Sequence, residues 1–269
     1  MTVALLRWVV PVALGQGRHA PRVVERNLLV ARRMWLVFLS GVLEPVFYLL
    51  AIDVGLGRLV GDVSGPGGAT VSYAAFAAPA LMAASAMNGA LYESTFNIFF
   101  KLRYGKLYDA MLATPLSPLD IALGEIGYSQ LRGLLYAVAF MGVMGALGLL
   151  TSLWAVLAIP AAILLGFAFG AVGLAAVTFM RSWVDLDLVN LAILPLFLFS
   201  ATFYPLDVYP PALQLVTQLS PLYHGVTLIR SLTLGVVGPQ LLVHVAYLLL
   251  VAAIGAAIAS RRLHRQLAP

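Results

Sequence analysis

The sequence predicts an all-α membrane protein with six transmembrane helices. Of its 269 residues, 62% are hydrophobic and only 10% are charged, against roughly 25% charged residues in soluble domains. A soluble fold with so few charges could not cover its outside. Apolar segments of about 20 residues, the length that crosses a ~30 Å hydrocarbon core, recur along the chain. Basic residues gather between these segments.

Composition and motifs exclude several kinds of chemistry. There is no cysteine, which removes disulfides, thiolate metal sites and cysteine nucleophiles. The Gly105-Lys106 pair is followed by Leu107, where a phosphate-binding loop needs Ser or Thr, and no HExxH motif occurs. We therefore expect no enzyme activity, no cofactor and no metal site in this chain. We interpret His224 as an interfacial hairpin residue, and the alternative is a ligand. The net charge of +5 marks a cytoplasmic membrane face rather than nucleic-acid binding.

The N-terminal segment is rich in arginine. Residues 1–33 hold six arginines and one acid, Glu25, which keeps this end in the cytosol. The apolar run Val3–Leu14 imitates a signal peptide, but the arginines after it disfavour translocation. From Arg22 to Trp35, charged and most apolar residues fall on opposite arcs, which predicts an amphipathic interface helix. Its basic side faces lipid headgroups or a partner and contains Arg22, Arg26, Arg32 and Arg33. Alternatively, it is only the anchoring flank of the first span.

The first span, Trp35–Gly55, contains Glu44-Pro45 near its middle. An acid at that depth costs on the order of 2.5–3.5 kcal/mol, so it should face protein or a wet cavity. Pro45 lacks a backbone donor and can kink the helix. We assign Glu44, Pro45 and Tyr48 to a candidate gate or substrate path. The alternative is a structural carboxylate bonded to a neighbouring helix.

A glycine-rich external loop, Leu56–Ser72, follows. The second span, Tyr73–Phe99, is rich in Ala, Ser and Gly, which favours close helix packing. The stretch Phe100–Glu125 is the longest internal segment with repeated charges. Within it, Lys101–Ala113 has helical spacing but is only about 20 Å long, too short to span. Thr114-Pro115 ends that helix, and Ser117-Pro118-Leu119-Asp120 reads as a capping box that starts another.

Four further spans complete the count. They are the third, to about Leu150; the fourth, Trp154–Met180, with Gly166 and Gly170 as packing residues; the fifth, Leu188–Tyr204; and the sixth, Gln240–Ser260. Between the last two, Ala212–Leu219 and Leu222–Leu234 are too short to span and predict a re-entrant hairpin. The residues that mark the turns and helix starts of this hairpin are Pro205, Pro210, Pro211, Ser220 and Pro221.

The basic residues set the orientation. The cytosolic side receives six from the N-terminal segment, three from the loop after span two, one after span four and three from the C-terminal end. Arg58 and Arg230 fall outside, and Arg132 lies in span three. Both termini are therefore expected in the cytosol. The chain is then one membrane domain, with an interfacial segment (1–33), six spans (34–260) and a cytosolic tail (261–269).

Several segments together resemble the type-2 ATP-binding-cassette exporter permeases, in the branch of the nodulation lipo-oligosaccharide exporter subunit NodJ and the daunorubicin-resistance permeases. These are the amphipathic N-terminal helix, Glu44-Pro45, GKLYDAMLATPLSPLDIALGE, and LPLFLFSATFYPLDVYP followed by SPLYHGVTLIRSL. The resemblance covers nearly the whole chain. It implies a cytoplasmic (inner) membrane permease that pairs with a second copy or a related permease. Two separate ATPase subunits would bind ATP and Mg²⁺.

The resemblance also assigns roles to residues. It implies a coupling helix that contacts the ATPase through Tyr104, Gly105, Lys106, Leu107, Tyr108, Asp109, Met111 and Leu112, assisted by Arg22–Arg33. Spans one, two and five would line the path of a substrate, which in this family ranges from glycolipids to polyketide drugs and polysaccharides. We expect charged residues at Leu107 and Tyr108 to uncouple transport and leave the fold intact. The alternatives are an ion-coupled secondary transporter, for which internal repeats are not evident, and a non-transporting scaffold or sensor.

Overall fold

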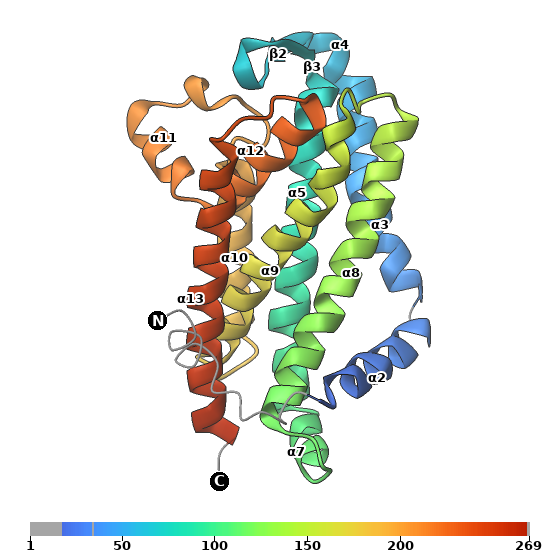
Figure 1. The fold of residues 1–269 in the computed structure, drawn as a ribbon, viewed down its shortest axis with the longest axis vertical. Coiled ribbons are helices and arrows are strands. Elements are labelled where there is room, and N and C mark those ends of the chain that lie inside the picture. The colour runs from blue at the N-terminus through green and yellow to red at the C-terminus, as the bar shows by residue number, and fades with distance from the viewer. Residues whose placement is uncertain (1–17, 34, 268–269) are drawn as a thin grey trace.

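The computed structural model, which describes residues 18–33 and 35–267, is a helical bundle with one long axis (Figure 1). The helices along that axis are α3 (Trp35–Ala51), α5 (Tyr73–Tyr92), α8 (Pro118–Ala146), α9 (Ala158–Val177), α10 (Asp185–Leu198) and α13 (Leu241–Leu267). One end of the bundle carries a small sheet, and the other carries α2 (Ala20–Arg33), α7 (Leu107–Leu112) and the end of α13. We call these the sheet end and the α7 end.

The segment 56–72 corrects the expectation of a plain loop. After α3, a π-helical turn, η1 (Ile52–Leu56), and α4 (Gly57–Val60) continue the helix. Then β2 (Asp62–Ser64) pairs antiparallel with β3 (Thr70–Ser72), with Val63 opposite Val71. The turn η2 (Pro66–Gly68) between them contains Gly67 and Gly68 at positive φ, which glycine adopts without strain. The protein is therefore mostly helical but not all-α.

The second predicted span is one long helix with a π-helical turn inside it. The Ser72 hydroxyl accepts a hydrogen bond from the Ala75 N–H and caps α5. The helix continues through η3 (Glu93–Asn97) and α6 (Ile98–Arg103). Nearly all of α5 is buried, because its alanines let neighbouring helices approach. The predicted close packing is confirmed.

The helix predicted over Lys101–Ala113 is wrong in its extent. The chain turns at residues 104–106, where the Gly105 N–H bonds to the Phe100 carbonyl and Lys106 is left-handed, with φ 42°. Only Leu107–Leu112 forms α7. The capping box that follows is confirmed: the Asp120 N–H donates to the Ser117 hydroxyl (3.1 Å), and the Ser117 N–H donates to Asp120 Oδ2 (2.8 Å).

Helix α9, preceded by the turn η4 (Leu153–Leu157), forms the centre of the packing with α5, α8 and α13. Gly166 and Gly170 face Ala90 of α5, so the predicted packing role is confirmed. On the other side, Gly255 of α13 approaches the α9 backbone. A Cβ at Gly255 would lie 2.8 Å from the carbonyl carbon of Ala171.

Helix α10 ends at Leu198, six residues before the predicted end of the fifth span at Tyr204. The next turn contains Ala201 at φ 54°. The Arg230 guanidinium donates to the carbonyls of Ala201 (2.9 Å) and Thr202 (3.3 Å), and its Nε donates to the Phe76 carbonyl (2.9 Å). Arg230 is thus buried in the protein, and its place on the external side of the membrane stays a prediction.

The predicted hairpin contains two helices, as expected, after a short turn, η5 (Leu206–Val208). α11 (Pro211–Gln218) and α12 (Pro221–Leu234) each begin at a proline, and the Ser200 and Ser220 hydroxyls lie 2.7 Å apart. Pro205 and Pro210 stand just before η5 and α11. Helix α11 lies at the sheet end (Figure 1), whereas α12 packs on α5, α9 and α13. The re-entrant depth stays a prediction.

Among the described residues, three helices are long and apolar enough to cross a membrane: Tyr73–Arg103, Leu153–Val177 and Leu241–Ala259. Helix α10 has 14 residues, about 21 Å at 1.5 Å per residue, which is short for a hydrocarbon core of ~30 Å. The chain is an integral membrane protein, and the count of six spans stays a prediction.

We predict that Gly255→Ala destabilises the fold by about 1–3 kcal/mol, because the added Cβ meets rigid α9 backbone. Gly142→Ala on α8 is the control, since a Cβ there meets nothing within 4 Å and alanine favours helix. Thermal unfolding in nanodiscs compares the two. Equal midpoints for both variants would contradict the close α9–α13 contact.

Candidate functional site

A buried ion pair joins three segments at the α7 end. Lys101 Nζ of α6 donates to Glu125 Oε2 of α8 over 2.7 Å, and Asn27 Nδ2 of α2 donates to the same oxygen over 3.0 Å. Lys101 Nζ also donates to Asn27 Oδ1 (3.3 Å). The Glu125 side chain is only 2% exposed. Because a buried carboxylate needs such partners, this cluster fixes α2 and α6 against α8.

A glycine lets α2 reach α8. A Cβ on Gly124 would lie 2.4 Å from the Val23 Cβ and 3.0 Å from the Ala20 carbonyl oxygen. One turn earlier, Asp120 Oδ1 accepts a hydrogen bond from the His19 N–H (2.8 Å). The start of α2 is therefore held by the first two turns of α8. Sequence reasoning did not predict this contact, since Asn27 and Gly124 belong to no motif.

Helix α7 is anchored by its inner face. Tyr108 and Met111 are 3% and 7% exposed and pack with Phe99 and Ile121 in a second apolar core. The Tyr108 hydroxyl lies beside Glu125, and burial together with this carboxylate raises the pKa of Tyr108 well above its usual value. The expectation that a charge at Tyr108 spares the fold is therefore wrong, because it would enter this core.

The outer face of α7 and its preceding turn are open. Tyr104, Gly105, Lys106 and Asp109 are exposed, whereas Leu107 and Leu112 are half-buried. Between α2 and the side of α7 that carries Ala110 and Met111 lies a groove of about 210 Å³. Its walls are Arg22, Val23, Arg26, Ala110, Met111, Thr114 and Leu116. The structure thus brings two separately predicted elements, the N-terminal helix and the coupling helix, to one surface.

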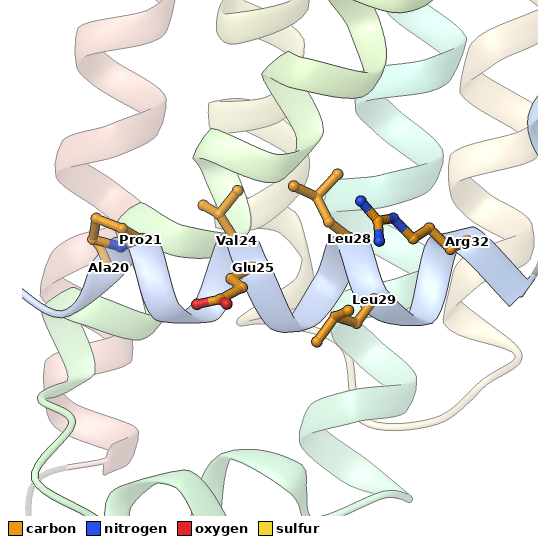
Figure 2. Close-up of a pocket in the computed structure, with 7 residues that line it drawn as sticks. All are labelled: Ala20, Pro21, Val24, Glu25, Leu28, Leu29 and Arg32. Carbon is orange, nitrogen blue, oxygen red and sulfur yellow. The ribbon is translucent and has the colours of Figure 1, made fainter.

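The four arginines of α2 do not share that surface. Arg22 and Arg26 line the groove with α7, and Arg22 forms an exposed ion pair with Glu25 (3.0 Å). Arg32 lines a second groove, of about 560 Å³, along α2. Figure 2 shows Val24 and Leu28 on one side of the helix there and Glu25 and Leu29 on the other. Arg33 ends α2 and is exposed.

The buried side of α2 is narrower than the predicted apolar arc. Val23 and Asn27 are buried, but Leu28, Leu29 and Val30 are exposed. An exposed apolar face on an amphipathic helix fits the predicted place in a membrane interface.

A second buried ion pair lies farther from the α7 end. Arg132 of α8 donates from Nη1 to Glu93 Oε2 of η3 (2.7 Å) and from Nε to the Tyr136 hydroxyl (3.0 Å). The Asn97 amide also donates to Glu93. Sequence reasoning placed Arg132 in span three and did not pair it with Glu93. The pair ties the π-helical turn to α8, and such turns often occur at functional sites.

An apolar groove of about 560 Å³ lies between η3, α9 and α10, with Arg181 and Asp185 at its α7 end. The outward leucines of α10, among them Leu188 and Leu191, are exposed.

Of the three residues assigned to the candidate gate, Tyr48 is exposed on α3, whereas the side chains of Glu44 and Pro45 lie outside the described part of the structure. No group of three or more His, Asp or Glu residues that could hold a metal occurs within residues 18–33 and 35–267.

Comparison with known proteins gives one consistent result. The family model described as ABC-2 type transporter matches residues 22–234. Nodulation protein J of Rhizobium leguminosarum bv. viciae is 30% identical over 90% of this chain and 93% of its own length. The same protein of bv. trifolii is 33% identical over 78% and 79%, respectively. The inner membrane transport permease YadH of Escherichia coli K12 is 24% identical over 76% and 78%.

We predict that Lys101→Met destabilises the α7 end by on the order of 3 kcal/mol, because it leaves the Glu125 charge buried without its cation. The double variant Lys101→Met/Glu125→Gln should recover part of the loss, since no lone charge remains. Thermal unfolding in nanodiscs measures both. A double variant less stable than the single one would show that the ion pair does not carry this contact.

Proposed function

Because the chain belongs to the ABC-2 type transporter family, we propose that it is the permease subunit of an ATP-driven exporter. Permeases of this family work with an ATP-binding subunit. The proposed substrate is an amphipathic or lipid-like molecule, such as a glycolipid or a drug, moved outward across the cytoplasmic membrane. Support comes from one relative, the inner membrane transport permease YadH. The substrate class follows from the range of substrates that the resemblance to exporter permeases implies.

One observation carries the proposal: α2 and α7 form a shared groove that is tied rigidly to the bundle. The exposed Tyr104, Lys106 and Asp109 would contact the ATPase, and so would Arg22 and Arg26 at the wall of the groove. The buried Tyr108 and Met111 would transmit its motion to the bundle. The Lys101–Glu125 ion pair would then pass this motion on to α6 and α8, which it joins. Movement of the partner would thus reach the long helices directly.

The charge distribution supports a cytosolic α7 end. The basic residues of α2, the α6–α7 segment, the α9–α10 turn and the end of α13 all belong to this end, whereas Arg230 near the sheet end is buried. Lys and Arg concentrate on the cytoplasmic side of membrane proteins. We infer six spans with both termini in the cytosol.

A second permease, identical or related, would cover the exposed apolar faces of α3 and α10. These faces include Phe47 of α3 and Leu188, Leu191 and Leu194 of α10, and the exposed Val54 of η1 continues the first of them. Lipid can also cover them, so dimerisation is part of the proposal and rests on the family. A substrate path between protomers would bring Glu44, Pro45 and Tyr48 to its wall.

We predict that Ala110→Trp abolishes transport and stable association with the ATPase, because the indole fills the groove between α2 and α7. Ala110 is exposed, so the thermal midpoint should stay unchanged. Ala69→Trp in the exposed turn at the sheet end is the matched control. Co-purification from native membranes, with mass spectrometry of the subunit ratio, measures association. A normal ratio and normal export for Ala110→Trp would exclude this groove, and a wild-type chain that purifies alone would favour the carrier or scaffold alternatives.

We predict that Glu44→Gln lowers transport of a cationic drug at least several-fold, because the path loses its acid, and leaves transport of a neutral lipid-like substrate near the wild-type rate. Uptake into inverted vesicles with both substrates measures the ratio. Equal transport of the cation by variant and wild type would assign Glu44 a structural role.

A further inference from the structure

Two histidines that are far from the proposed ATPase surface meet between α12 and α13. Nδ1 of His224 lies 2.7 Å from Nδ1 of His244, and Nε2 of His224 lies 2.9 Å from the Gln218 carbonyl oxygen. The His224 ring stacks on Tyr247, with centroids 3.9 Å apart, and Tyr223 meets both imidazoles edge-on. His224 is buried and His244 is half-buried, so the pair has one open side.

The hydrogen bonds determine the tautomers. A carbonyl oxygen only accepts, so Nε2 of His224 carries the proton. In the neutral ring, Nδ1 of His224 then carries a lone pair and no proton, and it faces His244. The Nδ1–H of His244 donates to that lone pair. A fixed N–H to carbonyl bond on the far ring nitrogen is the usual support of a metal-binding histidine.

We propose that His224 and His244 together bind a transition-metal ion such as Zn²⁺ through their two Nδ1 atoms. Transfer of the His244 proton from Nδ1 to Nε2 through solvent leaves both Nδ1 atoms unprotonated and close together. Zn–N bonds of about 2.0–2.1 Å in tetrahedral geometry need the two nitrogens about 3.3 Å apart. The half-buried His244 must therefore tilt toward the ion while its Nδ1 moves away from that of His224 by roughly 0.6 Å.

The chemistry of the pair selects the kind of ion. Neutral imidazole suits Zn²⁺, Cu²⁺ and Ni²⁺, whereas Mg²⁺ and Ca²⁺ prefer oxygen ligands. Water completes the coordination, since no third His, Asp or Glu joins the pair among the described residues. The ion would link α12 of the hairpin to α13. The inference concerns binding by the chain alone and does not depend on the transport function.

The test is Zn²⁺ titration of the purified full chain in nanodiscs, made without a polyhistidine tag. We expect one Zn²⁺ per chain and affinity at least about tenfold weaker in His224→Ala and His244→Ala. The control His19→Ala/His264→Ala removes the other two histidines of the chain and should bind as wild type does. Zn²⁺ should also raise the thermal midpoint of wild type and not that of His244→Ala, whereas Mg²⁺ should do neither.

A spectroscopic readout covers the case in which His224→Ala does not fold. Bound Cu²⁺ should show hyperfine coupling to two imidazole nitrogens in wild type and to one in His244→Ala. The proposal is overturned if His244→Ala binds Zn²⁺ as tightly as wild type does, if the His19→Ala/His264→Ala variant loses the binding, or if Mg²⁺ competes equally.

Discussion

The buried carboxylate of Glu125 is the constraint on which the α7 end depends. A charge removed from water is costly unless hydrogen bonds and an opposite charge compensate it. Here the compensation comes from Lys101 of α6 and Asn27 of α2, with Tyr108 of α7 beside it. One residue of α8 therefore requires three other segments in fixed places. A surface made of α2 and α7 can act as one body because of this shared requirement.

At the sheet end, a buried cation, Arg230, also needs compensating partners. Arg230 of α12 is buried, donates to three backbone carbonyls and lies 3.7 Å over the Phe76 ring. Carbonyl dipoles and an aromatic face replace water around the guanidinium. Its bonds to the Ala201 and Thr202 carbonyls hold a backbone turn that ends α10 early. The position of the hairpin is thus coupled to α5, the most buried helix of the bundle.

Between these two ends the connection is continuous helix. The chain runs from Phe76 of α5 through the π-helical turn at Glu93 to Lys101 of α6, and the Glu93–Arg132 pair joins that turn to α8. A displacement of α7 therefore has a direct physical route toward the hairpin. The π-helical turn is the place on this route where the helix could change length, because a π-helical turn holds one residue more than an α-helical turn.

Local chemistry alone determined much of this protein. Composition specified a membrane chain, Ser117-Pro118-Leu119-Asp120 specified a capping box, Pro211 and Pro221 began two hairpin helices, and Gly166 and Gly170 marked a packed face. Each of these depends on residues within a few positions of one another. Only the tertiary structure decided which face of α7 is buried, that Asn27 and Lys101 share Glu125, that Arg230 holds the α10 turn, and that His224 meets His244. These contacts join segments 20 to 154 residues apart, and no local pattern encodes them, because burial and charge pairing are settled by how the helices assemble.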